Sequence, residues 1–287
     1  MSNRNFLFIY NDKAGKGSIF KKLQYIKKLF SKKEICFKFI NILDLNNTVH
    51  IENFDTVVAI GGDGTVLAVL PYIVNKGIKL GIIPCGTANL LAEKLNIPQN
   101  ISQAVDILIN GTKKLIDVGK AGNSYFALRV GYGMDADIVN GANSFLKNKF
   151  GYLAYLVQGI KSILNLRTKS FEIRTDNKCF NVKASAVIVS NSGNMFRDKF
   201  SVSPESDISD GKLDIFVLRA RNIREFLTVF FQILFNKHKI GPNVMYGKTH
   251  SISIKTNNNK FHVDGEACSS QKVDISLIHN GLAVMVP

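Results

Sequence analysis

The sequence predicts a parallel α/β domain at the N-terminus, followed by a mainly antiparallel β domain. Three observations support this fold class. Strand and helix patterns alternate up to about residue 118, strand patterns dominate afterwards, and small-residue turns follow three successive apolar runs in the first part. Because 287 residues exceed what one core usually supports, two domains are expected, at residues 1–118 and 119–287.

The expected elements of the first domain alternate along the chain. The run Val57–Ile60 is short, apolar and β-branched, as buried strands are. The turns that follow parallel strands gather along one sheet edge, where ligands bind. In order, we expect a strand at Phe6–Tyr10, a helix at Ile19–Phe30, strands at Cys36–Ile42 and Val57–Ile60, helices at Val66–Val74 and Ala88–Leu95, and a helix at Ile101–Asn110.

The second domain is expected to consist of short strands. Apolar and β-branched runs recur there, interrupted by two helix patterns. The expected strands are Ser124–Val130, Phe171–Arg174, Ala184–Ser190, Leu213–Leu218, Ser251–Lys255 and Leu282–Val286.

The turn Gly61–Thr65 reads GGDGT and carries the most specific chemistry of the first domain. Glycines at a strand-to-helix turn let backbone N–H groups approach a ligand, and a helix N-terminus favours phosphate. The carboxylate of Asp63 would repel phosphate unless Mg²⁺ lies between them. A nucleotide triphosphate held with its metal is therefore the simplest interpretation, although such glycines can also serve packing alone.

Motifs along the whole chain resemble the diacylglycerol kinase catalytic-domain family, in particular its soluble bacterial lipid kinases, which are related to sphingosine kinases and more remotely to NAD kinases. The motifs are NDKAGKG at 11–17, GGDGT at 61–65, PCGTANLLA at 84–92, GYGMDADI at 131–138, SPESDISDGKLD at 203–214 and VDGE at 263–266. The resemblance implies a Rossmann-like, NAD-kinase-like fold for the α/β domain and a β-sandwich for the second domain. It also implies an ATP-dependent lipid kinase.

The resemblance assigns roles to individual residues. Asp63 would ligate or water-bridge the Mg²⁺ of ATP, and Glu266 would take the proton from the acceptor hydroxyl. A second, structural Mg²⁺ would lie at Asp207, Asp210 and the carbonyl of Lys212. The nucleotide contacts would be Asn11, Gly15, Gly61, Gly62, Gly64, Thr65, Gly86 and Thr87.

Other readings of these residues stay open. Taken without the resemblance, Asp264-Gly265 is also compatible with a plain hairpin turn that leaves Glu266 in solvent. The segment 207–211 is equally compatible with an ordinary acidic turn, and Asp135 either lines the site or starts a helix.

The chain departs from the family pattern after GGDGT. The family commonly has x-Asn/His-Glu there, whereas this chain has Val66-Leu67-Ala68, and Asp12 stands where proline is usual. Two alternatives to a lipid kinase therefore remain. One is an NAD kinase, and the other is a catalytically weak, membrane-associated nucleotide-binding protein.

Charge and helix patterns indicate a lipid surface as partner. Apolar residues recur at helical spacing along Arg219–Ile240 and Lys147–Arg167, with lysine and arginine around them. Such helices can lie in a lipid interface or dock on the protein core, and both readings stay open. With a net charge of +15, we expect a lipid substrate at an anionic membrane surface, and no nucleic acid, since no binding motif for it is present.

Cysteine usage indicates the compartment. The four cysteines are widely spaced without a C-x-x-C pair, which favours a reducing environment over a disulfide framework or a zinc site. The apolar stretch at the N-terminus is too short for a signal peptide. We therefore expect a cytoplasmic protein that associates peripherally with membranes; no pattern indicates its oligomeric state.

Overall fold

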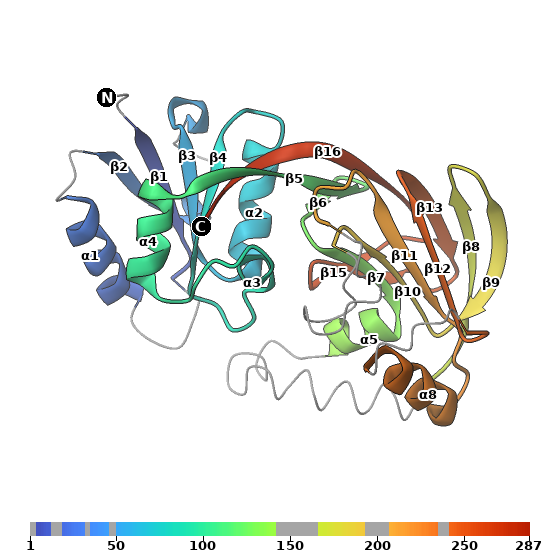
Figure 1. Ribbon diagram of the computed structural model, residues 1–287. Coiled ribbons are helices and arrows are strands. Elements are labelled where there is room, and N and C mark those ends of the chain that lie inside the picture. Colours follow the sequence, from blue (N-terminus) through green and yellow to red (C-terminus); the bar gives the residue numbers. More distant parts are fainter. Residues whose placement is uncertain are drawn as a thin grey trace. The chain divides into compact units, whose positions relative to one another are not determined.

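The computed structural model describes residues 4–12, 19–31, 35–45, 50–141, 166–192, 207–234 and 241–287 (Figure 1). The chain forms two compact units. The first unit comprises Met1–Ile116 and Asn280–Pro287, and the second comprises Asp117–His279. The last eight residues thus belong with the α/β part, because the end of strand β16 pairs in parallel with strand β4 through Ala283 and Val284.

The first unit is built on a parallel sheet, as the sequence predicts. Its strand order is β2-β1-β3-β4, and all three of these pairings are parallel. The chain moves from β1 to β2 on one side and then crosses to β3 on the other side of β1. Its elements are β1 (Asn5–Tyr10), α1 (Ile19–Phe30), β2 (Cys36–Asn41), the 3₁₀ turns η1 (Ile42–Asp44) and η2 (Ile51–Asn53), β3 (Thr56–Gly61), α2 (Asp63–Ile73), β4 (Lys79–Pro84), α3 (Leu90–Lys94) and α4 (Ile101–Asn110).

The core of the first unit explains why its helices form where they do. Helix α1 buries Ile26 and Phe30 on the side that faces the sheet. The ring of Phe30 meets that of Phe8 edge to face, with centroids 4.9 Å apart. Helices α1 and α4 pack side by side, and Leu108 of α4 lies against Gly81 of β4, where a side chain would collide with it (Figure 1).

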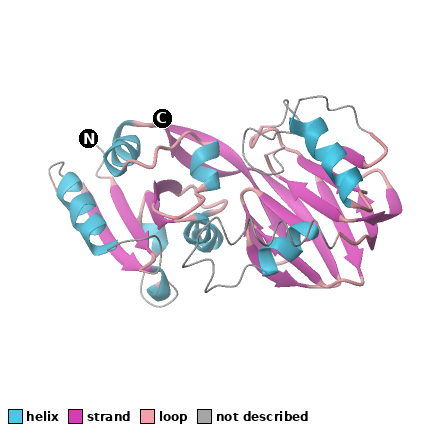
Figure 2. Ribbon diagram, turned by 90° about the horizontal axis from the view of Figure 1, so that it is seen from below, coloured by secondary structure: helices cyan, strands magenta, loops and turns pink. Residues whose placement is uncertain are grey.

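The second unit is a sandwich of two antiparallel sheets, which confirms the predicted β-sandwich. One sheet has the order β12-β11-β10-β7-β14-β15, and the other runs from β16 through β13 and β8 to β9, with β5 and β6 beside it. Figure 2 shows how strongly strands dominate this unit. Its elements are β5 (Thr112–Ala121), which begins in the first unit, β6 (Ser124–Phe126), β7 (Arg129–Gly133), α5 (Met134–Gly141), β8 (Lys169–Thr175), β9 (Cys179–Ala184), β10 (Ala186–Ser190), β11 (Leu213–Leu218), α8 (Ile223–Leu234), β12 (Val244–Thr249), β13 (Ser251–Thr256), β14 (Lys260–Val263), β15 (Glu266–Ser269) and β16 (Lys272–Val286).

The core of the sandwich lies between the two sheets. Tyr132 of β7 and Val189 of β10 come from one sheet, while Phe171 of β8 and Ile254 of β13 come from the other. The rings of Tyr132 and Phe261 are stacked at 5.3 Å. Alternating apolar residues of both sheets therefore fill one continuous core.

Two predicted strands are divided in the structure. The run Ser124–Val130 forms β6 and β7 with a break at residues 127 and 128, and Ala184–Ser190 is shared between β9 and β10. The first break has a physical cause, described below. The predicted helix Lys147–Arg167 lies, up to residue 165, outside the described residues.

Within the described part of the chain, no helix has both the length and the apolar character needed to span a membrane.

Candidate active site

The ends of β1, β3 and β4 lie side by side at the carboxyl edge of the parallel sheet, as the sequence predicts. Tyr10 at the end of β1 is paired with Ile60 of β3, and Gly61 at the end of β3 is paired with Pro84 at the end of β4. The turns that follow these strands therefore start side by side. The strand order also reverses between β1 and β3, and open α/β sheets bind ligands in the crevice at such a reversal.

The predicted nucleotide contacts are distributed over these turns. Asn11 follows β1 directly, the GGDGT residues follow β3, and Gly86 and Thr87 follow β4. Gly15 lies outside the described residues. Gly64 and Thr87 are exposed, so a ligand at this edge can reach them.

The GGDGT turn and the turn after β4 touch through their backbones. A methyl group added to Gly86 would lie 2.4 Å from the Cα of Gly62, closer than real Cβ contacts. Asn89 holds the second turn in shape, because its Oδ1 accepts from the Gly86 N–H at 3.0 Å and its Nδ2 donates to the Gly86 carbonyl at 2.9 Å. Close approach thus requires glycine at position 86, and it leaves a methyl group on Gly62 only 3.1 Å from the Cα of Gly86.

The side chain of Thr65 lies inside the turn. Its side chain is buried, and a methyl group on Gly61 would collide with its Oγ1. Its N–H donates to the Gly62 carbonyl at 2.9 Å. The hydroxyl of Thr65 therefore faces the neighbouring glycine, whereas that of Thr87 lies on an exposed residue.

Asp63 is the acid at the centre of this edge. It is the first residue of α2, and its Oδ1 accepts a long hydrogen bond of 3.3 Å from the N–H of Leu91 in α3. Burial raises the pKa of Asp63 above its ordinary value, and the backbone N–H groups of residues 89–91 only partly oppose this. Among the described residues, no lysine, arginine or histidine forms an ion pair with it.

The Asp63 carboxylate, in these surroundings, is suited to bind Mg²⁺. A half-buried carboxylate without a basic neighbour in the described residues is costly in its charged form, and a bound cation would remove that cost. Carboxylate oxygen is also the ligand type that Mg²⁺ prefers.

The VDGE segment of the second unit forms a tight hairpin turn. Asp264 and Gly265 have φ values of 46° and 88°, and Val263 pairs with Glu266 across them. Asp-Gly is the sequence that favours this two-residue turn, because both positions need positive φ. Glu266 is the first residue of β15 and is exposed.

Asp264 anchors that turn to the break between β6 and β7. Its carboxylate accepts from the N–H groups of Ala127 at 2.7 Å, Leu128 at 3.1 Å and Arg129 at 2.6 Å. The run Ser124–Val130 is divided where the chain passes from the sheet of β5 and β6 to the sheet of β7, β10 and β14, and Asp264 binds the N–H groups at this crossing. Asp264 is therefore a structural anchor as well as a turn residue.

A buried ionic cluster lies beneath the same turn. His262 and Asp135 are joined by a hydrogen bond of 2.8 Å between Nε2 and Oδ2, and Arg129 lies 3.4 Å from the other carboxylate oxygen. The N–H of Gly265 donates to His262 Nδ1 at 3.3 Å, so the other ring nitrogen, Nε2, faces Asp135. Gly131 makes room for this pair, since a methyl group there would overlap both side chains.

The charge of Asp135 is stabilised in this cluster. Burial opposes ionisation, but the charge of Arg129 and the contact with His262 outweigh it and lower the pKa of Asp135 to about 2. The sequence left two roles open for Asp135. The structure shows it as the second residue of α5 and as the partner of His262.

The turn predicted to bind a second Mg²⁺ is stabilised by hydrogen bonds and an ion pair within the protein. Asp210 accepts from the Lys212 N–H at 2.9 Å and pairs with Lys248 Nζ at 2.7 Å. Asp117, which is fully buried, accepts from the Gly211 N–H at 2.7 Å. A metal at Asp207, Asp210 and Lys212 would compete with the ammonium of Lys248, and the described residues contain no cluster of three acidic, histidine or cysteine side chains. This site stays a prediction.

Several structural partners were missed from sequence. Asn89, Asp117 and His262 each make specific contacts, with residues 3, 94 and 127 positions away. Asp117 has a signal of its own, since it is a lone acid in the apolar run Leu115–Val118. The signals for Asn89 and His262 are weak, because they look like a turn residue and a strand residue.

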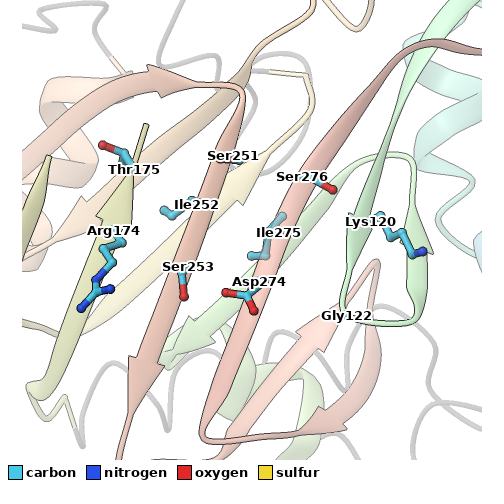
Figure 3. A pocket seen from close by; sticks show the side chains of 10 residues that line it. All are labelled: Lys120, Gly122, Arg174, Thr175, Ser251, Ile252, Ser253, Asp274, Ile275 and Ser276. Atoms are coloured by element: carbon cyan, nitrogen blue, oxygen red, sulfur yellow. The ribbon is translucent and has the colours of Figure 1, made fainter. Parts of the chain in front are cut away.

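A shallow hollow of about 450 Å³ lies elsewhere on the second unit (Figure 3). Lys120, Arg174 and Asp274 stand around it, together with serine and isoleucine side chains of β13 and β16. None of the predicted site residues lines this hollow, so it is not the candidate site.

Comparison with known proteins identifies the family. Residues 5–121 match the family model of the diacylglycerol kinase catalytic domain, and residues 128–286 match that of the YegS C-terminal NAD kinase beta sandwich-like domain. The chain therefore belongs to the diacylglycerol kinase catalytic-domain family, as its motifs indicate. Membership in a kinase family supports a phosphotransferase that uses a nucleotide such as ATP.

Individual relatives agree with this assignment. The chain is 31% identical to a Bacillus subtilis (strain 168) protein named diacylglycerol kinase over 222 residues, which is 75% of this chain and 72% of the relative. It is also 31% identical over 270 residues, 90% of each chain, to a Streptococcus pneumoniae protein provisionally named a lipid kinase. A solved structure from Bacillus anthracis str. Sterne superposes with a TM-score of 0.82 over 99% of this chain and 97% of its own, which at 24% identity supports the fold alone.

Proposed function

We propose that the protein is an ATP-dependent lipid kinase that phosphorylates a hydroxyl of a diacylglycerol-like or sphingoid lipid and requires Mg²⁺. The observation that carries the proposal is the environment of Asp63. Its carboxylate is half-buried at the carboxyl edge of the sheet, has a raised pKa and has no basic partner among the described residues. Such a group is poised for a metal–phosphate ligand.

The residues proposed to bind ATP and Mg²⁺ belong to the first unit. Asn11, Gly64 and Thr87 stand on three turns of one sheet edge and would contact the phosphates through N–H, amide and hydroxyl groups. Asp63 would hold Mg²⁺, which when bound neutralises phosphate charge during transfer. The contact between Gly62 and Gly86 fixes the spacing of two of these turns.

Glu266 is the residue proposed to take the proton from the lipid hydroxyl. A general base needs an ionised carboxylate that can reach the hydroxyl, and Glu266 is exposed at the start of β15. Its turn is held from two sides, by the three N–H groups bound to Asp264 and by the N–H of Gly265 bound to His262. Asp135 and His262 thus act as positioning residues for Glu266.

The relatives support a lipid as acceptor. One is named diacylglycerol kinase and another carries a provisional lipid kinase name, over 72% and 90% of their lengths. Apolar contacts discriminate weakly among acyl chains, so the proposal specifies a class of lipid hydroxyl.

The test is a transfer assay with γ-labelled ATP, Mg²⁺ and a total lipid extract, run in parallel with NAD as the only acceptor. We expect label in a lipid product that is lost when the metal is chelated. Label in NAD alone would overturn the proposal in favour of an NAD kinase. ATP binding without transfer to either acceptor would favour the nucleotide-binding alternative suggested by Val66-Leu67-Ala68.

A further inference from the structure

Residues 127–129, where the chain passes from β6 to β7, have their peptide groups held from two sides. On one side, the Asp264 carboxylate accepts from all three N–H groups. On the other side, Asn191 Nδ2 donates to the Ala127 carbonyl at 3.0 Å, and the Asn191 N–H donates to the Leu128 carbonyl at 2.8 Å. The position of this segment therefore depends on both residues.

The side-chain amide of Asn191 also reaches strand β5. Its Nδ2 donates to the Asp117 carbonyl at 2.7 Å, so one nitrogen holds the carbonyls of two buried residues, Asp117 and Ala127. Asp117 is the residue at which the chain enters the second unit. Among neutral side chains, only a primary amide offers two N–H donors on one nitrogen. Asparagine at position 191 thus joins β5 to residues 127–129.

This arrangement leaves the oxygen of the Asn191 amide without a partner. Asn191 is 1% exposed, and no donor among the described residues reaches its Oδ1. A buried acceptor without a donor is costly, and such groups are uncommon in folded proteins. The two bonds of Nδ2 are therefore kept at a cost in stability, as polar groups at functional sites often are.

The segment held by Asn191 is bonded to the turn that carries the proposed general base. Asp264, which binds the N–H groups of the segment, stands two residues before Glu266. The Asp264 N–H also donates to the Arg129 carbonyl at 2.9 Å, so the turn and the segment are joined in both directions. A shift of residues 127–129 would therefore be passed on to the turn of Glu266.

We propose that Asn191 is a positioning residue for Glu266: its side-chain amide fixes residues 127–129, and through Asp264 these residues fix the turn on which the base stands. The inference deepens the proposed function and rests on it, because a positioned base matters only where Glu266 takes a proton. A general base must stay within hydrogen-bond reach of the hydroxyl, and a small misplacement lowers the rate steeply. Asn191 acts through the turn and not on the nucleotide, so it should affect the rate of transfer and leave ATP binding alone.

The test is a double-mutant cycle between Asn191→Leu and Glu266→Gln, followed by initial rates of lipid phosphorylation. Leucine is close to asparagine in size and removes both N–H donors. With Glu266 present, we expect kcat to fall about tenfold and the KM for ATP to stay within about twofold. In the Glu266→Gln background, the same substitution should change kcat by less than about twofold, because no base is left to position. Equal losses in both backgrounds would overturn the inference, since a merely structural residue acts whether or not Glu266 is present.

Two further variants guard against a loss of folding. Ser185→Ala is the matched control, because it removes a buried side-chain hydrogen bond of 3.1 Å, to the Leu218 carbonyl, at the opposite end of β10. Its kcat should stay within about twofold of wild type. Asn191→Ser keeps a hydroxyl donor and should lower kcat about threefold, again only when Glu266 is present. Wild-type kcat in either folded Asn191 variant would contradict the positioning role.

Amide hydrogen exchange separates this inference from the proposed function. In Asn191→Leu, the N–H groups of Ala127, Arg129 and Gly265 should exchange at least about tenfold faster than in wild type, whereas Ser185→Ala should leave them unchanged. Unchanged exchange at Gly265 in Asn191→Leu would overturn the inference. Faster exchange there, in a protein that transfers no phosphate to lipid, would overturn only the proposed function.

Discussion

Two of the Asp-Gly sequences in the chain, at residues 63–64 and 264–265, place their aspartates in different surroundings. Asp63 in the first unit accepts a long hydrogen bond of 3.3 Å from the Leu91 N–H, and although neighbouring backbone N–H groups also favour its charged form, burial outweighs them and raises its pKa. Asp264 in the second unit accepts from three backbone N–H groups, the shortest at 2.6 Å. Hydrogen bonds to the charged form stabilise a carboxylate; Asp264 accepts three of them, whereas for Asp63 the cost of burial exceeds the effect of its backbone N–H partners. The comparison teaches that the partners of each acid, more than the motif around it, separate a ligand-binding group from a structural anchor.

The largest effect should follow from neutralising Asp63. In Asp63→Asn, phosphoryl transfer to lipid should fall about 1000-fold, because the charge that holds the metal is gone. The melting temperature should not fall, since the ionised form is opposed by burial. Initial rates and thermal melts check both expectations. An Asp63→Asn protein with more than a tenth of wild-type activity would remove this side chain from the mechanism.

Removing the charge of Glu266 should have the next largest effect. Glu266→Gln should lower the maximal rate about 100-fold, the usual contribution of a general base, with ATP affinity unchanged. A melting temperature equal to that of wild type would show that the exposed side chain carries no fold stability. A rate within twofold of wild type would contradict the role.

The substitution Asp264→Ala tests the structural role of the Asp264 carboxylate, as Asp63→Asn tests the proposed role of Asp63 in metal binding. It leaves three N–H groups without their acceptor, so we expect a loss of about 3 kcal/mol in the free energy of unfolding, measured by urea denaturation. Activity should fall as well, because the Glu266 turn loses its anchor. A loss of less than about 0.5 kcal/mol would show that solvent replaces these bonds.

A smaller effect is expected from crowding the contact between the glycine turns. Gly86→Ala places a methyl group 2.4 Å from the Cα of Gly62, so the KM for ATP should rise about tenfold as the turns separate. Gly247→Ala is the matched control, because nothing lies within 4 Å of the added methyl group and the backbone is not strained. Equal effects of the two substitutions would contradict the importance of the contact.

The smallest effect concerns pH. The pKa of Asp63 is raised above its ordinary 3.8 in the folded protein, so its ionisation disfavours folding as the pH rises from 3.8 through the folded pKa. Relative to wild type, the stability of Asp63→Asn should therefore increase over that range and stay constant above it. Denaturation curves between pH 3.5 and pH 7 check the sign; the opposite slope would contradict the raised pKa.

Local patterns predicted much of the fold. The limits of α1, α4 and β11 match the predicted segments, because amphipathic spacing and β-branched runs are local properties. The parallel order of β1, β3 and β4 then brought the ends of these three strands to one edge, as expected.

Long-range contacts explain what the sequence did not reveal. The run Ser124–Val130 is divided because the chain changes sheets there, where Asp264, 136 positions away, binds the Leu128 N–H, and no local pattern carries that information. His262 pairs with Asp135, 127 positions away, in space left by Gly131. Such pairs follow from tertiary packing, which overrides local preference.

The most direct test of the account is a backbone amide NMR titration with ATP and Mg²⁺. The account predicts shifts concentrated at Gly62, Gly64, Thr65 and Thr87, with saturation that Asp63→Asn weakens at least about tenfold. Shifts confined to the second unit, or no shifts at millimolar ATP, would contradict a nucleotide site at the edge of the parallel sheet.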